Sequence, residues 1–159
     1  MHEFFLLIFD FLLTESGWNV TADEFDIYTG TYYKRKLVPD IVMRNNSGCI
    51  VFDAKYKRMA FVPKDFDRSD FFQIHTYAGA LGKQEDIRMA GLLYPLNSII
   101  AAEDVRKLTH EGFYFPDNSG RKFICEGIYI GDTVKEKSDL NEAEHEFCNR
   151  IENLLSSIS

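Results

Sequence analysis

The chain has 159 residues, 45% of them hydrophobic, which is enough to bury one globular core, so we expect a single domain over residues 1–159. Its three cysteines, Cys49, Cys125 and Cys148, are widely spaced, and there is no C-x-x-C pair and no paired histidines. This spacing indicates neither a disulfide framework nor a zinc site, and we expect reduced thiols in the cytoplasm. The formal net charge of −7 at first argues against a nucleic-acid partner.

The first apolar segment, residues 4–13, is hydrophobic except for Asp10. It is too short to span a membrane and lacks the cationic start and cleavage site of a signal peptide. We therefore expect a buried helix that ends near residues 16–17, and no membrane partner. Asp10 would lie among apolar neighbours, where an ionised carboxylate is costly unless a cation or hydrogen-bond donors compensate it. Pairing of Asp10 with a basic side chain is the structural alternative.

Residues 18–28 have strand-like content and lead into residues 32–36, a polar and aromatic stretch. Aromatic residues beside cations suit contact with nucleic acid, although such tyrosines more often cover a sheet. From Lys34 to Arg68 the chain has nine basic residues and four acids, a local balance of +5, whereas the remainder is acidic. Binding to a phosphate backbone requires such a concentration of positive charge, and a solvated basic face is the alternative.

Two runs of β-branched and apolar residues, 37–43 and 49–57, flank a turn-forming cluster at residues 44–48. This pattern predicts an antiparallel hairpin. A loop of two or four residues in this turn places Asp40 directly opposite Asp53. Cross-strand partners have Cβ atoms roughly 4.5–5.5 Å apart, and like charges at that spacing destabilise a sheet unless something compensates them.

Strand periodicity puts Lys55 on the same face as Asp53, so an ammonium group joins the carboxylate pair. A hard cation such as Mg²⁺ is held by one or two carboxylates with waters and phosphate oxygens, which Asp40 and Asp53 could provide. Lys55 would then orient or deprotonate an attacking water, or stabilise charge on a phosphate during in-line displacement. The alternative is a strand-starting acid and a surface ion pair. The Pro39-Asp40 start and the matching register favour the metal site.

Residues 70–81 are predicted to form a helix capped by Asp70, with Gln73 as the return partner of a capping box. Gln73 and Tyr77 lie four residues apart and share one helical face. His75 lies off that face, and we expect an ordinary surface or packed histidine.

Residues 88–94 and 123–130 are predicted strands, the second an edge, and residues 101–112 form a helix or an irregular segment. Asp139, with Glu142 three residues later, is predicted to cap a final helix. Apolar residues recur along it every three or four positions, and we expect this stripe to pack on the sheet, with a dimer seam as the alternative. The stripe comprises Leu140, Ala143, Phe147, Ile151, Leu154 and Ile158.

Three segments resemble a known family: Pro39-Asp40-Ile41-Val42, Phe52-Asp53-Ala54-Lys55-Tyr56-Lys57 and Gln73-Ile74-His75-Thr76-Tyr77. The first two are similar to the PD-(D/E)xK motif of the restriction-endonuclease-like superfamily. All three together resemble the C-terminal nuclease domain of McrC, the cleavage subunit of the McrBC 5-methylcytosine restriction system. The resemblance is specific from about Phe4 to Leu81 and weak beyond. With the alternation of strands and helices, it implies a restriction-endonuclease-like α/β fold, a central mixed β-sheet flanked by helices.

The resemblance also implies roles for individual residues. In that superfamily two acids bind Mg²⁺, or Mn²⁺ in its place, and a lysine assists the attacking water; these roles correspond to Asp40, Asp53 and Lys55. A Gln-x-x-x-Tyr pair such as Gln73 and Tyr77 would lean on the active site and contact the DNA backbone or orient Lys55. The alternative, a capping Gln73 and a packed Tyr77, is equally open.

A third acid often lies on the first helix of these enzymes, near the metal-bound water. Asp10 matches this position, although McrC-like sequences usually have a glutamate there, and Glu3 or Glu15 could instead fill the role. Further DNA contacts are expected from the basic segment, through Lys34, Arg35, Lys36, Lys57 and Arg58.

The sequence therefore predicts a Mg²⁺-dependent DNA endonuclease, the cleavage component of a restriction or defence system. Its expected partners are double-stranded DNA, an AAA+ GTPase or other motor subunit, and a second copy in a homodimer. McrC-like proteins usually carry an additional N-terminal domain for the motor, which we expect this sequence to lack. The alternative is a catalytically silent module on the same scaffold that binds DNA or a partner subunit.

Overall fold

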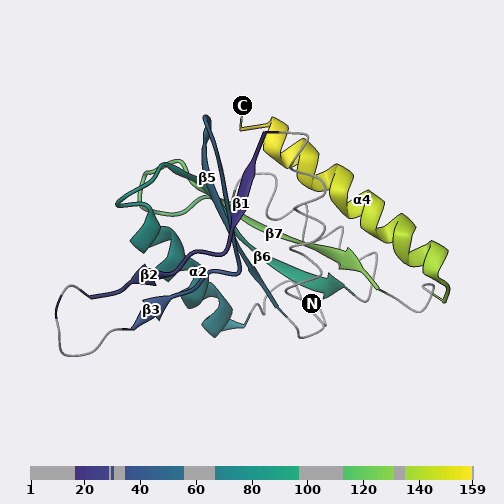
Figure 1. Ribbon diagram of the computed structural model, residues 1–159, viewed down its shortest axis with the longest axis horizontal. Coiled ribbons are helices and arrows are strands. Elements are labelled where there is room, and N and C mark those ends of the chain that lie inside the picture. The colour runs from purple at the N-terminus through teal and green to yellow at the C-terminus, as the bar shows by residue number, and fades with distance from the viewer. Residues whose placement is uncertain are drawn as a thin grey trace.

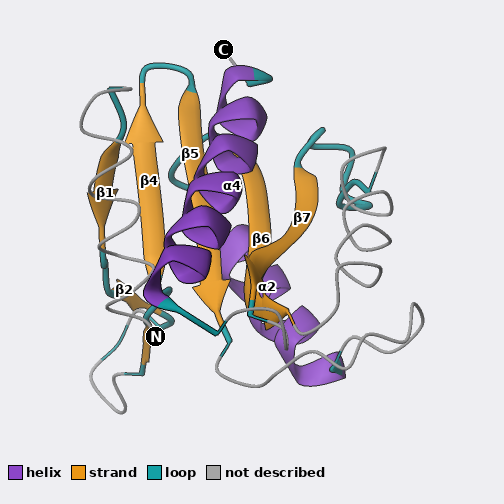
Figure 2. Cartoon of the chain, turned by 90° about the vertical axis from the view of Figure 1, so that its right-hand side faces the viewer, coloured by secondary structure: helices purple, strands orange, loops and turns teal. Residues whose placement is uncertain are grey.

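The computed structural model describes residues 17–28, 30, 35–55, 67–96, 113–130 and 135–158. Its main sheet (Figure 1) has five strands, which lie side by side in the order β1-β4-β5-β6-β7 in Figure 2. The first three pair antiparallel, whereas β5, β6 and β7 run parallel. The expected α/β fold with a central mixed sheet is thereby confirmed, and it is consistent with a restriction-endonuclease-like fold. The strands are β1 (Asn19–Thr21), β4 (Ile41–Asn45), β5 (Gly48–Ala54), β6 (Ile87–Leu96) and β7 (Lys122–Tyr129).

Two helices cover opposite faces of this sheet, α2 (Arg68–Leu81) on one and α4 (Lys137–Ser156) on the other (Figure 2). Each face has its own cluster of buried apolar side chains, with Val51 of β5 on the α2 side and Phe52 on the α4 side. Successive strand residues point to opposite faces, so the nearly continuous apolar run of β5 fills both cores.

The hairpin formed by β4 and β5 has the predicted register. Met43 pairs with Ile50 and Asn45 pairs with Gly48, which leaves Asn46 and Ser47 as the turn. The Asn45 side chain accepts a hydrogen bond of 2.8 Å from the Ser47 backbone amide, a local contact that favours a tight turn. The turn therefore fixes which residues meet at the far end of the hairpin.

Helix α2 begins earlier than the sequence pattern predicts. Its N-cap is Asp67, whose carboxylate accepts a hydrogen bond of 2.9 Å from the Ser69 amide. The prediction of a cap at Asp70 is therefore wrong, and so is the capping box with Gln73, whose side-chain amide is bound elsewhere. Asp70 lies instead in the first turn and is buried.

Helix α4 is capped by Glu136, three residues before the predicted cap. Asp139 lies inside the first turn, where its carboxylate accepts hydrogen bonds from the amides of Lys135 (2.9 Å) and Glu136 (3.0 Å). The Asp139 cap was therefore misplaced, although the return contact of a capping box is present. The predicted packing of the stripe on the sheet is confirmed, because Phe147 and Ile151 are fully buried in the cluster under α4.

Several other boundaries differ from the prediction. The expected strand at residues 18–28 is divided into β1 and β2 (Phe25–Asp26), and β2 pairs with β3 (Lys36–Leu37) as a separate two-stranded sheet. Strand β6 continues through Pro95, although the ladder between β5 and β6 ends at Leu93. Proline has no backbone N–H, but at this position the ladder with β5 loses no hydrogen bond because β5 has already ended. Among the described strands, β7 lies at the end of the sheet, as predicted, with an isolated antiparallel bridge between Tyr114 and its first residue, Lys122.

Some of the predictions concern parts of the chain outside the described residues. These are the first helix with Asp10, Glu3 and Glu15, and the segment at residues 101–112. Within the described residues no helix is long and apolar enough to cross a membrane. All three cysteines are buried, and none of them forms a disulfide, as their spacing predicts.

Candidate active site

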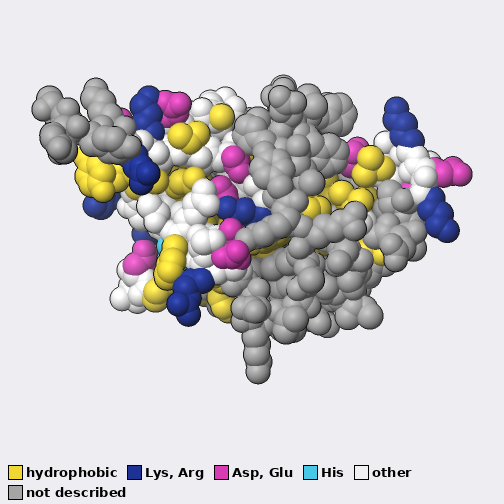
Figure 3. Space-filling view, turned by 90° about the horizontal axis from the view of Figure 1, so that it is seen from below, with side chains coloured by type: hydrophobic (Ala, Val, Ile, Leu, Met, Phe, Trp, Pro, Cys, Tyr) yellow, Lys and Arg dark blue, Asp and Glu magenta, His cyan; other side chains and the backbone are white. Residues whose placement is uncertain are grey.

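Charged side chains of both signs lie beside one another on one face of the molecule (Figure 3). Asp53, near the end of β5, is 2% exposed and forms an ion pair with Lys55. Its Oδ1 accepts a hydrogen bond of 3.3 Å from Gln73, whereas its buried Oδ2 accepts none with good geometry, although the ammonium of Lys55 lies against it. Burial raises the pKa of Asp53, with further contributions from the charges of Asp40 and Asp70, and Lys55 opposes this rise only in part.

Asp40 lies directly before β4 and reaches across to β5. Its Oδ2 accepts a hydrogen bond of 2.8 Å from the backbone amide of Ala54. Strand β4 begins only at Ile41, so the carboxylate takes the place of the ladder acceptor that a longer strand would supply. This contact brings Asp40 close enough for its charge to raise the pKa of Asp53, as the register predicts.

Lys55 directly follows β5, and its side chain is 14% exposed. Besides Asp53, its ammonium donates a hydrogen bond of 2.7 Å to Gln73 Oε1 and lies 3.4 Å from Asp70 Oδ1. Burial by itself lowers the pKa of Lys55, but the hydrogen bonds and charges of Asp53 and Asp70 outweigh it and raise the pKa overall. Lys55 is therefore an ammonium ion at neutral pH.

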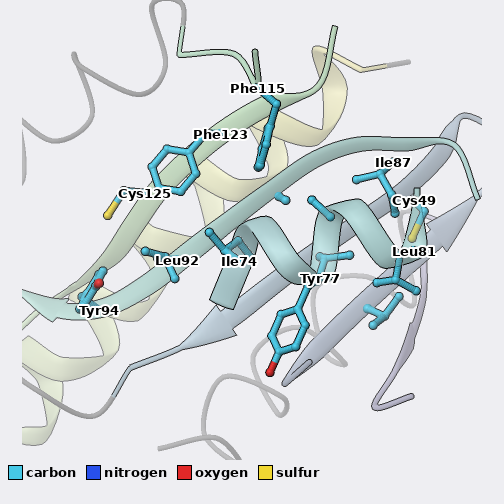
Figure 4. Close-up of a cluster of buried hydrophobic side chains, with 14 of the residues drawn as sticks. Cys49, Ile74, Tyr77, Leu81, Ile87, Leu92, Tyr94, Phe115, Phe123 and Cys125 are labelled. Carbon is cyan, nitrogen blue, oxygen red and sulfur yellow. The ribbon is translucent and has the colours of Figure 1, made fainter. Parts of the chain in front are cut away.

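Gln73 and Tyr77 of α2 face these charged groups. The Gln73 amide donates to Tyr77 Oη (2.7 Å) as well as to Asp53, and the Tyr77 hydroxyl donates to the backbone carbonyl of Val38 (3.1 Å). Figure 4 shows Tyr77 projecting from α2 as part of the apolar cluster under that helix. Of the two interpretations that the sequence left open, the arrangement favours the one in which this pair leans on the acids and orients Lys55.

Two further polar residues of this site escaped the sequence analysis. Asp70 of α2 is 4% exposed, and its Oδ2 accepts a hydrogen bond of 2.8 Å from the hydroxyl of Tyr94 on β6. The signal was available in part, because Asp70 lies on the same helical stripe as the buried residues Ile74, Tyr77 and Leu81. An acid on an otherwise apolar stripe indicates a specific partner across the interface.

The donor atoms fit a hard divalent cation that keeps most of its waters. Mg²⁺ typically takes one or two carboxylates and completes its coordination with water and phosphate oxygens. Asp40 and Asp53 supply two neighbouring carboxylates, and the buried Oδ2 of Asp53 lies against the ammonium of Lys55. Within the described part of the chain no group of three or more acids, histidines or cysteines is arranged to enclose a metal ion. The residues therefore fit an open magnesium site rather than a protein cage.

Of the five cations predicted to contact DNA, the structure describes two, and both lie at β3. Arg35 and Lys36 are exposed at β3, and Lys36 forms an ion pair with Glu24. The other three, Lys34, Lys57 and Arg58, lie outside the described residues, so their role stays a prediction. His75 is exposed and packs its ring on Phe115, apart from the acids, as expected for an ordinary histidine.

Comparison with known protein families supplies an independent observation. The model of the McrBC 5-methylcytosine restriction system component matches residues 12–95, which is more than half of the chain. The chain belongs to this family. The McrBC match includes β4, β5, α2 and most of β6, the elements that carry or directly flank the site residues described above. As a member of the McrBC family, the chain is related to McrC-like proteins and to restriction systems. No curated protein gives a significant match.

Proposed function

We propose that this McrBC family member is a Mg²⁺-dependent DNA endonuclease that hydrolyses phosphodiester bonds, the cleavage component of a restriction or defence system. One observation carries the proposal: the buried carboxylate of Asp53 lies beside Asp40 and a lysine, with its pKa raised by burial. A buried acid next to a second acid lowers stability, and a bound dication would offset that cost. Perturbed acids of this kind concentrate at functional sites.

In this proposal Asp40 and Asp53 hold the metal ion. When bound, Mg²⁺ would polarise a phosphate oxygen and lower the pKa of a water ligand. Lys55, whose pKa is raised by the hydrogen bonds and charges of Asp53 and Asp70, would orient or deprotonate the attacking water or stabilise charge on the phosphate. Gln73 fixes the ammonium of Lys55 through its oxygen and the carboxylate of Asp53 through its amide.

Double-stranded DNA is the substrate we propose, and a motor subunit of the restriction system is the proposed partner. The chain has a net charge of −7, and the described cation Lys36 is already paired with Glu24. Weak intrinsic affinity for a phosphate backbone follows from this charge, since nucleic-acid binding depends on cations that replace counterions. A partner that brings the domain to DNA would compensate for it.

Plasmid cleavage tests this function. Purified protein is incubated with supercoiled plasmid, methylated or unmethylated at cytosine, in Mg²⁺ or in EDTA. We expect nicked or linear product from at least one plasmid in Mg²⁺ only, and its loss in Asp53→Asn. Asp86→Asn is the matched control, because Asp86 is an exposed acid beside the first residues of β5, away from Asp53.

The rival function, a silent binding module, predicts a different result. Parent and Asp53→Asn proteins would then retard DNA equally in a gel, and neither would cut it. If Asp53→Asn cuts DNA at the rate of the parent, Asp53 takes no part in the reaction. Equal DNA retention by the two proteins together with cutting by the parent alone supports the nuclease.

A further inference from the structure

Asp70 is a buried acid that helix α2 does not need as its cap. It occupies the first turn of α2 on the stripe that faces the sheet, and only 4% of the residue is exposed. The N-cap is already provided by Asp67, so Asp70 is not required to begin the helix. An apolar residue at this position would pack in the cluster below, whereas a buried carboxylate costs several kcal/mol before its contacts are counted, as a rough scale. Its contacts therefore point to a purpose other than packing.

Those contacts hold Asp70 in one orientation and direct it at Lys55. Oδ2 accepts the hydrogen bond of 2.8 Å from Tyr94, and Oδ1 lies 3.4 Å from Lys55 Nζ. Tyr94 is 1% exposed, and burial, followed by the hydrogen bond to Asp70, raises the pKa of its hydroxyl. The hydroxyl therefore stays protonated and always donates, which leaves the second carboxylate oxygen to face the ammonium.

Among the described residues, Lys55 thus has two anionic neighbours of different kinds. Asp53 is a proposed metal ligand, whereas Asp70 is anchored to Tyr94 on the other side of the ammonium. A dication bound by Asp53 would repel the ammonium at short range and weaken its attraction to that carboxylate. Asp70 and the neutral oxygen of Gln73 would then be the groups that keep Lys55 in place.

We infer that Asp70, oriented by Tyr94, is a positioning residue that holds the Lys55 ammonium at the reaction centre when a metal ion occupies the neighbouring carboxylates. This inference rests on the proposed nuclease function and assigns a role within the same site. Removal of the Asp70 charge leaves substrate binding intact but lets Lys55 move away from the scissile phosphate. Loss of such supporting contacts typically costs roughly 10- to 100-fold in activity.

The test compares Asp70→Asn with Asp67→Asn. Both replace a carboxylate by a carboxamide in the same turn of the chain, but only Asp70 contacts Lys55, whereas asparagine at position 67 can still cap α2. Steady-state cleavage gives kcat and KM, and thermal unfolding shows whether each variant is folded. A second readout needs no DNA: a brief pulse of an amine-acylating reagent in Mg²⁺, with Lys55 labelling measured by mass spectrometry relative to the exposed Lys83.

We expect Asp70→Asn to lower kcat by roughly 10- to 100-fold with KM changed less than about twofold. Labelling of Lys55 should be faster than in the parent, while Asp67→Asn behaves as the parent in both assays. Tyr94→Phe should lower kcat less, and added to Asp70→Asn it should cause no further loss, because Tyr94 acts through Asp70.

A parental kcat in folded Asp70→Asn, or parental labelling of Lys55, overturns the inference. So does an equal loss of kcat in Asp67→Asn, which would indicate a general effect of the helix terminus. If the parent protein cuts no DNA, the proposed function fails on its own. The labelling assay still decides in that case whether Asp70 holds Lys55.

Discussion

The Tyr77 hydroxyl donates a hydrogen bond of 3.1 Å to the backbone carbonyl of Val38, two residues before Asp40. This contact joins α2 to the segment that carries Asp40. Through Gln73, the same helix also contacts Asp53. One helix therefore contacts both the Asp53 carboxylate and the segment that leads to Asp40. The geometry of the proposed metal site therefore depends on how α2 is seated.

Replacement of Tyr77 by phenylalanine tests this dependence. Tyr77→Phe keeps the packed ring but removes the hydrogen bonds to Val38 and Gln73, so we expect roughly tenfold slower DNA cleavage and a loss of about 1 kcal/mol in unfolding free energy. Cleavage rates and denaturant unfolding provide the measurements. Tyr114→Phe, at a tyrosine that is 54% exposed, is the matched control and should change neither. Parental activity in Tyr77→Phe would show that the hydroxyl does not position Asp40.

Asp53 should lower the stability of the metal-free protein at neutral pH. Its pKa is raised above the ordinary value of 3.8, mainly by burial, so its contribution to stability is complete below that value and is lost as the pH rises through the raised pKa. Asp53→Asn, which stays neutral, should therefore unfold at a higher temperature than the parent in EDTA at pH 7. The difference should shrink as the pH approaches 4. A lower unfolding temperature for Asp53→Asn at pH 7 would contradict this sign.

Mg²⁺ should raise the unfolding temperature of the parent protein at pH 7. A ligand that binds only the folded state stabilises it, and the two carboxylates provide the binding site in the folded state alone. The same addition should leave Asp53→Asn unchanged. Calorimetric scans with and without Mg²⁺ give the comparison, and Asp86→Asn should respond as the parent does.

Arg44 is predicted to stabilise the end of the sheet opposite the acids. Its guanidinium donates to Glu85 at 2.7 and 2.6 Å and to Thr21 at 2.9 Å, so Arg44→Ala should cost about 2 kcal/mol. The hydrogen bond from Arg44 lowers the pKa of Glu85 below 4.5, so this stability is present above that value and is lost as the pH falls through the lowered pKa.

Chemical denaturation at pH 7 and at pH 4 measures both effects of Arg44→Ala. The matched control is Arg88→Ala, which breaks an exposed ion pair of 3.4 Å with Asp86 and should cost about 0.5 kcal/mol or less. Equal destabilisation by the two substitutions would show that burial of the Arg44 cluster contributes nothing.

Two glycines should respond oppositely to alanine. Gly79 lies on the exposed side of α2 with no atom within 4 Å of an added Cβ, so Gly79→Ala should stabilise the protein by about 1 kcal/mol through helix propensity. In the sheet, a Cβ on Gly91 would lie 2.2 Å from the carbonyl oxygen of Ile124, so Gly91→Ala should cost about 2 kcal/mol or more. The unfolding free energies of the two variants measure both effects. Destabilisation by Gly79→Ala would contradict the prediction for α2.

The hairpin could be predicted from the sequence because its determinants are local. Asn46 and Ser47 form the turn, and the turn sets the register, which pairs Ile41 with Phe52 directly beside Asp40 and Asp53. Strand periodicity alone predicts that Lys55 lies on the same face as Asp53. These three residues therefore needed no information about the rest of the fold.

The contacts of α2 could not be predicted in the same way. Asp67 and Asp70 both offer plausible caps, and the choice between them decides whether Asp70 is a terminal residue or a buried partner of Lys55. Its other partner, Tyr94, is 24 positions away on a different element, and no local pattern joins them. Sequence reasoning accordingly found the acids of the hairpin and missed the acid of the helix.

The register of β6 shows the same limit. Cys49 pairs with Ile87 but Ile50 pairs with Met89, so one residue of β6, Arg88, is passed over. Ile87 and Ala90 therefore face the same core although they are three positions apart, against the period of two that predicts strand faces. Such an irregularity depends on the neighbouring strand and has no signature in β6 itself.

Titration of the protein with a divalent cation tests the central claim most directly. In calorimetry with Mg²⁺, or in electron paramagnetic resonance with Mn²⁺, the parent and Asp86→Asn should bind the ion, and Asp40→Asn and Asp53→Asn should bind it at least about tenfold more weakly. If the parent binds no divalent ion at millimolar concentration, or if Asp53→Asn binds it as the parent does, these carboxylates do not form a metal site.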